Sequence, residues 1–166
     1  MRGLVPIRFS TYNIRNGRNR GLKSVLTGMA QANMDLGTFQ ETKDTDGSYT
    51  RGSAGYSVAA TDMPSRQCSG MAVFHQLAPR FGVESVHKFG PNVVIFQLAT
   101  GERRLYILVC HLSPNDTSTI ESVVAALKER PIGAKLLVVG DFHANLAESE
   151  GDRRGGILRR PWRRRD

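Results

Sequence analysis

The sequence predicts an α/β domain, and three features of the chain lead to that prediction. Short apolar or alternating runs typical of β-strands begin near residue 7 and recur as far as residue 139. Two segments with helical spacing interrupt them, over residues 22–30 and 118–130. Between residues 56 and 110 the expected strands follow one another with no helix between them, which favours antiparallel pairing over repeated βαβ units.

A strand, a helix and a second strand are expected near the N-terminus. Residues 7–14 alternate and are rich in β-forming side chains, and a turn signal, Arg15-Asn16-Gly17, follows them. Apolar side chains at positions 22, 25, 26, 29 and 30 mark one face of a helix. Residues 34–39 give the second strand, and the polar, glycine-containing segment 43–55 is expected to be a mobile loop.

Further strands are expected over residues 56–60, 70–74, 81–86, 93–98 and 105–110. The second helix, residues 118–130, can be capped by Ser118 or Thr117, and Pro131 ends it. Ser118 and Glu121 have the spacing of a capping box. The apolar run 136–139 is long enough for a strand buried on both faces, and it leads into Gly140 and Asp141. Asp141 has two readings: a turn carboxylate that caps a loop, or a carboxylate whose burial requires a partner such as a metal or a cation.

The composition fits one globular domain and excludes several classes of protein. The chain has 166 residues, of which 40% are hydrophobic and 23% charged. No apolar run approaches a membrane span, and residues 1–10 lack the apolar core of a signal peptide, so we expect an intracellular protein without a membrane partner. Cys68 and Cys110 form neither a disulfide framework nor a zinc motif, and Cys110, which closes an apolar run, is expected to be a buried thiol.

The positive charge is concentrated near the C-terminus. The formal net charge is +8, and residues 151–166, with seven arginines and two aspartates, carry +5 of it, which leaves +3 for residues 1–150. The helix and strand patterns stop after residue 146, so we expect residues 149–166 to be a disordered, Arg-rich tail. Arginine clusters bind nucleic-acid phosphates without reading sequence, although a solvated charge run without a partner is equally open. The candidate contacts are Arg159, Arg160, Arg163, Arg164 and Arg165.

Polar side chains stand at or just beyond the ends of four expected strands. They are Asn13, Glu41, His111 and Asp141, with His143 two residues past the last. If these ends lie on one side of the fold, two carboxylates, an amide and two imidazoles surround a single cleft. Such a set suits Mg²⁺, which prefers oxygen ligands, rather than a closed zinc site. It fits metal-assisted attack of water on a phosphodiester, although each residue taken alone has an ordinary structural explanation.

Five ordered motifs carry a family resemblance. They are Thr11-Tyr12-Asn13-Ile14-Arg15-Asn16-Gly17, Phe39-Gln40-Glu41-Thr42, Ser69-Gly70-Met71-Ala72-Val73-Phe74, Val109-Cys110-His111-Leu112-Ser113-Pro114-Asn115-Asp116 and Val139-Gly140-Asp141-Phe142-His143-Ala144. Over residues 7–148 the chain resembles the endonuclease/exonuclease/phosphatase superfamily, and in particular the apurinic-like endonuclease domain of non-LTR retrotransposons. The resemblance implies a four-layered α/β sandwich, in which two mixed β-sheets lie face to face with helices outside them.

The same resemblance implies an activity and roles for individual residues. It implies an endonuclease dependent on Mg²⁺, or on Mn²⁺, that hydrolyses phosphodiesters in DNA within a reverse transcriptase polyprotein, with a nuclear location. Glu41 would be the metal ligand, Asn13 would help to hold metal or phosphate, and Asp141 would align or activate the attacking water. His111 and His143 occupy positions of two further catalytic groups, and Arg15 would contact the nucleic acid.

Three departures from the family's pattern lower the expected activity. His143 stands where the family has Asn, and His111 where it has a Tyr that contacts phosphate. The family's C-terminal Ser-Asp-His motif is absent, since no histidine follows His143. We therefore expect an incomplete domain, residues 1–148, with an unfinished second sheet, exposed strand edges and weak or no nicking of DNA. The alternative is a non-catalytic fragment that binds nucleic acid through its tail; the retrotransposon-like segment around His111 disfavours a phosphatase acting on lipid or inositol phosphates.

Overall fold

The computed structural model describes residues 7–14, 20–41, 56–60, 71–76, 82–100, 103–112 and 118–142. Within these ranges lie eight strands and two helices, in the order β1 (Phe9–Asn13), α1 (Arg20–Gln31), β2 (Leu36–Gln40), β3 (Tyr56–Ala60), β4 (Met71–Gln76), β5 (Gly82–Lys88), β6 (Val93–Thr100), β7 (Arg103–His111), α2 (Ser118–Glu129) and β8 (Lys135–Asp141). The expected elements are therefore all present. The expected mobile loop and the Arg-rich tail lie outside the described residues.

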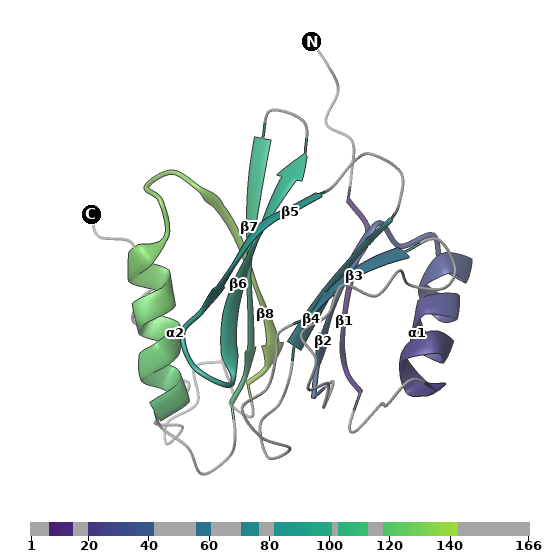
Figure 1. The fold of residues 1–166 in the computed structure, drawn as a ribbon, viewed down its shortest axis with the longest axis horizontal. Helices are drawn as coiled ribbons and strands as arrows, with labels where there is room; N and C mark the ends of the chain where they lie inside the picture. Colours follow the sequence, from purple (N-terminus) through teal and green to yellow (C-terminus); the bar gives the residue numbers. More distant parts are fainter. Residues whose placement is uncertain are drawn as a thin grey trace, which may run out of the picture.

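The strands form two four-stranded sheets, ordered β1-β2-β4-β3 and β5-β6-β7-β8. β1 and β2 run parallel, as do β7 and β8, while the other neighbouring pairs are antiparallel. Figure 1 shows the two sheets facing each other, with α1 beyond the first sheet and α2 beyond the second. The predicted α/β fold with two sheets and the antiparallel pairing of the middle strands are confirmed.

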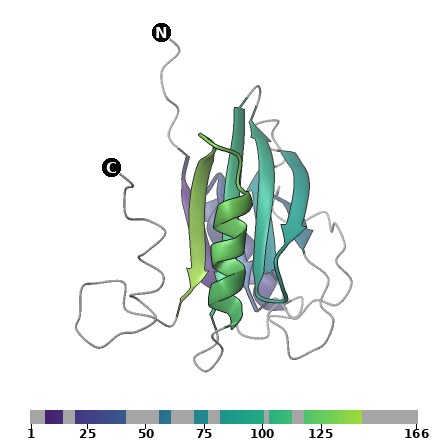
Figure 2. The same ribbon diagram turned by 90° about the vertical axis from the view of Figure 1, so that its left-hand side faces the viewer.

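Successive side chains of β6 point to opposite faces of its sheet, and both faces are covered by other parts of the protein. Val94, Phe96 and Leu98 belong to the apolar cluster between the two sheets, where Leu36 of β2 joins them. The intervening residues, Val93 and Ile95, pack with a second cluster under α2. Figure 2 shows α2 lying along this outer face of the second sheet. A run of apolar side chains without polar alternation therefore fits a strand that is buried on both sides.

The first sheet is covered by α1 in the same way. Leu26 and Met29 of the helix pack against Phe39 of β2 in a third apolar cluster. Gly37, the β2 residue on this face, lets the helix approach closely, because a Cβ there would lie 2.6 Å from the Met29 methyl carbon. The helix spacing read from the sequence thus predicts the buried face of α1.

One expectation about burial is wrong. The run 136–139 was expected to be buried on both faces, but only Val139 is buried, at 8% exposure, and the other three residues are half-buried. The reason is that β8 is an edge strand of its sheet, with β7 as its neighbour on one side. Cys110 is buried, as expected. Among the described residues, no helix combines the length and apolar character that a membrane span requires.

Candidate functional site

The strand pairing brings the four predicted strand ends to one place. In the first sheet Asn13 is paired with Gln40, so Glu41 follows immediately beside it. In the second sheet His111 is paired with Asp141. Since β1 and β8 contact each other across the sandwich, the ends of both parallel pairs meet at the same edge of the molecule. The polar groups therefore come from two different sheets.

Asn13 links the two carboxylates. Its Nδ2 donates one hydrogen bond to Oε1 of Glu41, at 2.8 Å, and another to Oδ2 of Asp141, at 3.0 Å. Because the same nitrogen reaches both oxygens, Glu41 and Asp141 lie no farther apart than two hydrogen-bond lengths. Two carboxylates at this separation repel each other, and the amide between them reduces that repulsion.

His111 completes the group. Its Nε2 lies 3.2 Å from Oε1 of Glu41, and its side chain is 11% exposed. The backbone holds it in place: the His111 amide donates to the Asn92 carbonyl at 3.0 Å, and the Leu112 amide donates to the Asp141 carbonyl at 2.8 Å. The imidazole is therefore fixed against the Glu41 carboxylate rather than free in solvent.

Two residues at the site have a backbone conformation that L-amino acids rarely adopt. Glu41 has a φ of 55° and Gly140, next to Asp141, has a φ of 148°. Gly140 could not carry a side chain, because a Cβ there would lie 1.8 Å from the Cys110 carbonyl oxygen. Strain of this kind clusters at functional sites, where the surrounding structure holds it. Both carboxylates of the site therefore lie on or beside a constrained backbone.

A buried polar network, which the sequence reasoning missed, supports this end of the first sheet. The Gln40 Nε2 donates to Oγ1 of Thr11 at 3.0 Å, and the Thr38 hydroxyl donates to the same oxygen at 3.1 Å. Thr38 and Gln40 are 0% and 2% exposed. Their spacing of two residues, in step with the buried Leu36, is the signal that would have placed both side chains between the sheets.

The donor set can be compared with what a cation needs. Within the part of the chain that the structure describes, no group of three or more His, Cys, Asp or Glu side chains is arranged to hold a metal. Mg²⁺ requires less, because it commonly keeps several waters and takes one or two carboxylates together with substrate phosphates. Glu41 and the Asn13 amide fit such a site, since they offer oxygen ligands beside a second carboxylate.

Cys110 is close to the site but is not suited to chemistry there. Burial, with a smaller contribution from the Asp141 charge, raises the pKa of the Cys110 thiol to about 12. The thiolate is the nucleophilic form of cysteine, so this side chain is inert near neutral pH. Of the other predicted site residues, His143, Arg15 and the five tail arginines lie outside the described residues.

Comparison with known proteins identifies the fold. No protein-family model matches the sequence, and no curated protein matches it. Among solved structures, the endonuclease domain of TRAS1, a telomere-specific non-LTR retrotransposon, is similar with a TM-score of 0.69 and 18% identity, over 93% of this chain and 70% of that one. An endonuclease/exonuclease/phosphatase family protein from Leptotrichia buccalis gives a TM-score of 0.65 and 10% identity, over 94% and 73%.

A third similar structure is D. rerio TDP2 in complex with a single-strand DNA product. It has a TM-score of 0.58 and 16% identity, over 84% of this chain and 61% of that one. The chain thus spans less than two thirds of the length of this TDP2 structure. At identities this low, the structural similarity establishes a shared fold. The predicted resemblance to endonuclease/exonuclease/phosphatase proteins is therefore confirmed at the level of fold.

Proposed function

Because this chain has the fold of the endonuclease/exonuclease/phosphatase proteins, we propose that it is a domain of that kind that hydrolyses phosphodiesters in DNA with a divalent cation. The observation that carries the proposal is the hydrogen bonding of one amide, Asn13, to both Glu41 and Asp141. We further propose the four layers of helix, sheet, sheet and helix, supported by the three separate apolar clusters.

The residues of the site suit separate roles in this reaction. Glu41 and Asn13 would hold Mg²⁺ or Mn²⁺, which when bound neutralises phosphate charge. Asp141 would orient the attacking water and take its proton, since its carboxylate shares the Asn13 donor with Glu41. His111, whose Nε2 lies 3.2 Å from the Glu41 carboxylate, would contact a phosphate oxygen of a substrate bound beside Glu41. His143 follows Asp141 closely enough in sequence to serve the same phosphate.

Charge and the similar structures support DNA as the substrate. The chain has a net charge of +8, which favours a polyanionic partner. One similar structure is a retrotransposon endonuclease domain and another holds a DNA product. We accordingly propose an origin in a retrotransposon-type polyprotein and a nuclear location.

Nicking of supercoiled plasmid DNA tests this function. We expect slow nicking in Mg²⁺ or Mn²⁺ and none in EDTA, because His111 and His143 replace residues that the resemblance expects to be Tyr and Asn. Glu41→Ala and Asp141→Ala should each lower the rate at least about 100-fold, whereas Glu129→Ala, a carboxylate at the end of α2, should leave it unchanged. Nicking that survives Glu41→Ala, or falls equally in Glu129→Ala, would contradict the proposal.

A non-catalytic protein is the second candidate, and the seven arginines of residues 151–166 favour it. In that case the protein binds nucleic acid through phosphate contacts that weaken steeply with salt. Replacing Arg159, Arg160, Arg163, Arg164 and Arg165 by Gln would abolish binding. Absence of nicking by the unmodified protein, together with that loss of binding, would favour this candidate over the first.

A further inference from the structure

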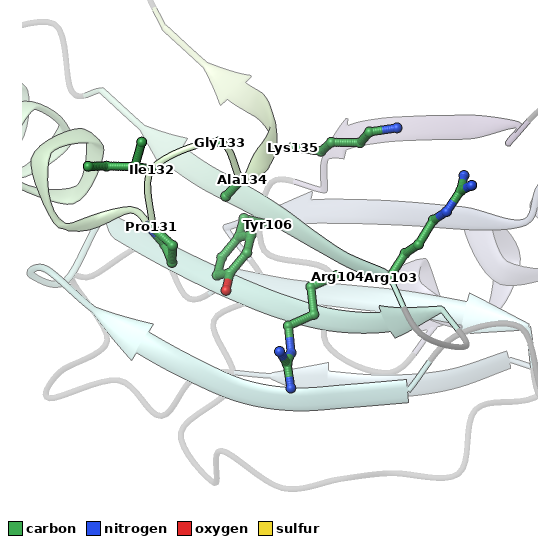
Figure 3. A pocket seen from close by; sticks show the side chains of 8 residues that line it. All are labelled: Arg103, Arg104, Tyr106, Pro131, Ile132, Gly133, Ala134 and Lys135. Carbon is green, nitrogen blue, oxygen red and sulfur yellow. The ribbon is translucent and has the colours of Figure 1, made fainter.

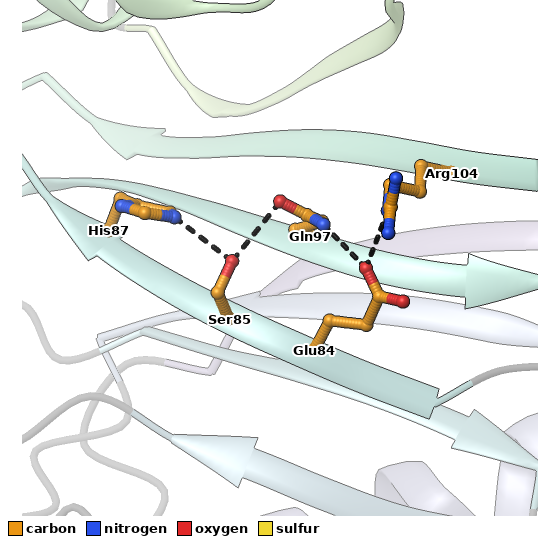
Figure 4. A network of polar contacts seen from close by, with 5 residues as sticks. All are labelled: Glu84, Ser85, His87, Gln97 and Arg104. Carbon is orange, nitrogen blue, oxygen red and sulfur yellow. Dashed lines mark hydrogen bonds and ion pairs between the residues drawn. The ribbon is translucent and has the colours of Figure 1, made fainter.

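The second sheet has two edge strands, β5 and β8, and they differ in character. β5 has the features that keep a strand edge from pairing with another chain, namely charged side chains, an alternating pattern of exposure and a bulge between Val83 and Ser85. Figure 4 shows polar contacts on its surface, in which Glu84 accepts hydrogen bonds from Gln97 and, at 2.9 Å, from Arg104. β5 is therefore a protected edge.

β8 lacks this protection. Between Lys135 and Asp141 the strand is Leu-Leu-Val-Val-Gly, without charge or proline, and its register with β7 is continuous. Leu136, Leu137 and Val138 are only half-buried, although such a run is typical of a strand buried on both faces. Figure 2 shows β8 at one margin of its sheet, and no strand among the described residues lies beyond it. An exposed apolar edge of this kind is a template for a further strand.

Alternate backbone groups of β8 point towards this open margin. The Val139 carbonyl accepts from Cys110 Sγ at 3.7 Å and the Asp141 carbonyl accepts from the Leu112 amide at 2.8 Å, so both carbonyls face β7. Because successive residues of a strand direct their N–H and C=O groups to opposite sides, those of Leu136 and Val138 face away from β7. They are the groups that an added strand would bind.

The sequence of β8 is complementary to itself in the antiparallel direction. Lys135 and Asp141 lie equally far from Val138, so pairing of Val138 with its own counterpart sets Lys135 of each copy opposite Asp141 of the other. Both lie on the face towards the first sheet, because Leu137 and Val139, in step with them, belong to the cluster between the sheets. Opposite charges directly across two strands stabilise their pairing. A shift of the centre to Leu137 or Val139 would set each charge opposite an apolar side chain.

A second copy fits this edge better than another part of the same chain. The sequence outside the described ranges contains no run of more than two hydrophobic residues, so it offers no strand with the apolar character of β8. A twofold axis perpendicular to the sheet also keeps the first sheets of both copies on one side. Their edge strand, β1, contacts β8 and carries Tyr12, which is 49% exposed. The two β1 margins therefore add to the area that a stable dimer requires.

We propose that this margin is an interface between two copies of the chain, in which the β8 strands pair antiparallel about Val138. Lys135 is exposed, and Figure 3 shows its side chain extending from the start of β8 beside a shallow pocket. In the dimer it lies beside Asp141 of the other copy, where its ammonium contacts a phosphate bound at that candidate site. This role of Lys135 rests on the proposed function, whereas the pairing of the strands does not.

Sedimentation velocity with the full-length chain measures the pairing. At about 50 µM we expect a dimer. Lys135→Glu sets two carboxylates opposite each other at both ends of the strand pair, so it should raise the dimer Kd at least about tenfold. The matched control is Lys88→Glu, which makes the same change of charge at an exposed position of β5 and should alter the Kd less than about twofold.

A charge swap tests the partners. Asp141→Lys alone should also weaken the dimer, because it sets two ammonium groups opposite each other. A mixture of the Lys135→Glu and Asp141→Lys variants should instead form a heterodimer, since both pairs again join opposite charges. Native mass spectrometry identifies the heterodimer by its mass. A mixture that stays monomeric, while the unmodified chain is dimeric, would overturn the proposed register.

A disulfide tests the register without a change of charge. Val138 faces its own counterpart, and Cα atoms of such a pair lie about 5.5 Å apart, within the range of a disulfide. In a Cys68→Ser background, Val138→Cys should give a cross-linked dimer on oxidation, with the 138–138 link identified by peptide mass spectrometry. Val86→Cys, at an exposed position of β5, should not.

Two results would overturn the proposal: a monomeric unmodified chain, or equal cross-linking at positions 138 and 86. Protection of the β8 amides from hydrogen exchange in a monomer would assign the edge to another segment of the same chain. Plasmid nicking is scored separately. A dimer that does not nick DNA leaves the pairing standing and removes the role of Lys135 at the site, whereas nicking by a monomer removes the pairing and leaves the proposed function intact.

Discussion

The two ends of the second sheet, although built from the same strands, differ in how far their polar and charged side chains are buried. Where β7 and β8 end, His111 is buried and Asp141 half-buried, both contact Asn13 or Glu41 of the other sheet, and the constrained Gly140 lies beside them. Where the same strands begin, Arg103 and Lys135 border an open pocket. Charged side chains are therefore held by hydrogen bonds at one end of the sheet and exposed to solvent at the other.

The largest effect should come from Gly140. Gly140→Ala places a Cβ against the Cys110 carbonyl and forces a φ of 148° on an L-residue, so we expect a loss of about 3–5 kcal/mol in the free energy of unfolding. Denaturant unfolding measures it. Gly133→Ala, at a φ of 77° with open space around it, should cost about 1 kcal/mol, and Gly82→Ala, also in open space, should cost almost nothing. Equal costs at positions 140 and 133 would show that the close approach of β7 and β8 is not required.

Alkaline pH should destabilise the folded protein, because it favours ionisation of the Cys110 thiol, which is buried in the folded state. Because burial raises the pKa of this thiol from 9.0 to about 12, the folded state favours the neutral form. The contribution of the neutral thiol to the free energy of unfolding is therefore complete below pH 9 and is lost as the pH rises from 9 towards 12. About 2 kcal/mol of this contribution is lost by pH 10.5. Cys110→Ala should show a shallower decline over this range when unfolding is followed by circular dichroism. Parallel declines in the two proteins would contradict the assignment.

Removal of the amide that joins the two carboxylates should lower the free energy of unfolding by a smaller amount. Asn13→Ala removes the amide that both Glu41 and Asp141 accept from, so we expect a cost of about 1–2 kcal/mol near neutral pH. Chemical denaturation of the variant measures this cost. An unchanged stability would mean that the two sheets are not joined through this amide in solution.

The exposed pair at the other end should give the smallest effect. Hydrogen bonds from Arg104 and then Gln97 lower the pKa of Glu84. The ion pair therefore stabilises the folded state at pH values above the ordinary pKa of a glutamate, and this stabilisation is lost as the pH falls. Solvent screens this pair, and we expect Glu84→Gln to leave the unfolding midpoint unchanged within error. A clear drop in the midpoint would show that the outer face of β5–β7 is more ordered than an exposed sheet surface.

The sequence predicted most of the fold because its strongest signals are local. The apolar run of β6 and the capping box of α2 are properties of neighbouring residues, and both elements lie where they were expected. The edge position of β8 is not local, since it depends on which strands pair. A four-residue apolar run therefore read as fully buried although only Val139 is.

At the candidate site, the residue types could be predicted from the sequence, whereas their contacts depend on the fold. Asn13, Glu41, His111 and Asp141 were singled out because polar groups follow strands, and the structure brings these four together. The amide bridge from Asn13 joins residues 128 positions apart, which no local pattern encodes. Thr38 and Gln40 were overlooked because buried polar side chains in a strand look like interruptions of its pattern.

Binding of Mn²⁺ tests whether Glu41 and Asn13 hold one divalent cation beside Asp141. Electron paramagnetic resonance reports free Mn²⁺ during a titration of the full-length chain. We expect one site per chain, with an affinity weakened at least about tenfold by Glu41→Ala and unaffected by Glu129→Ala. Equal Mn²⁺ affinity in the unmodified protein and in Glu41→Ala would contradict it.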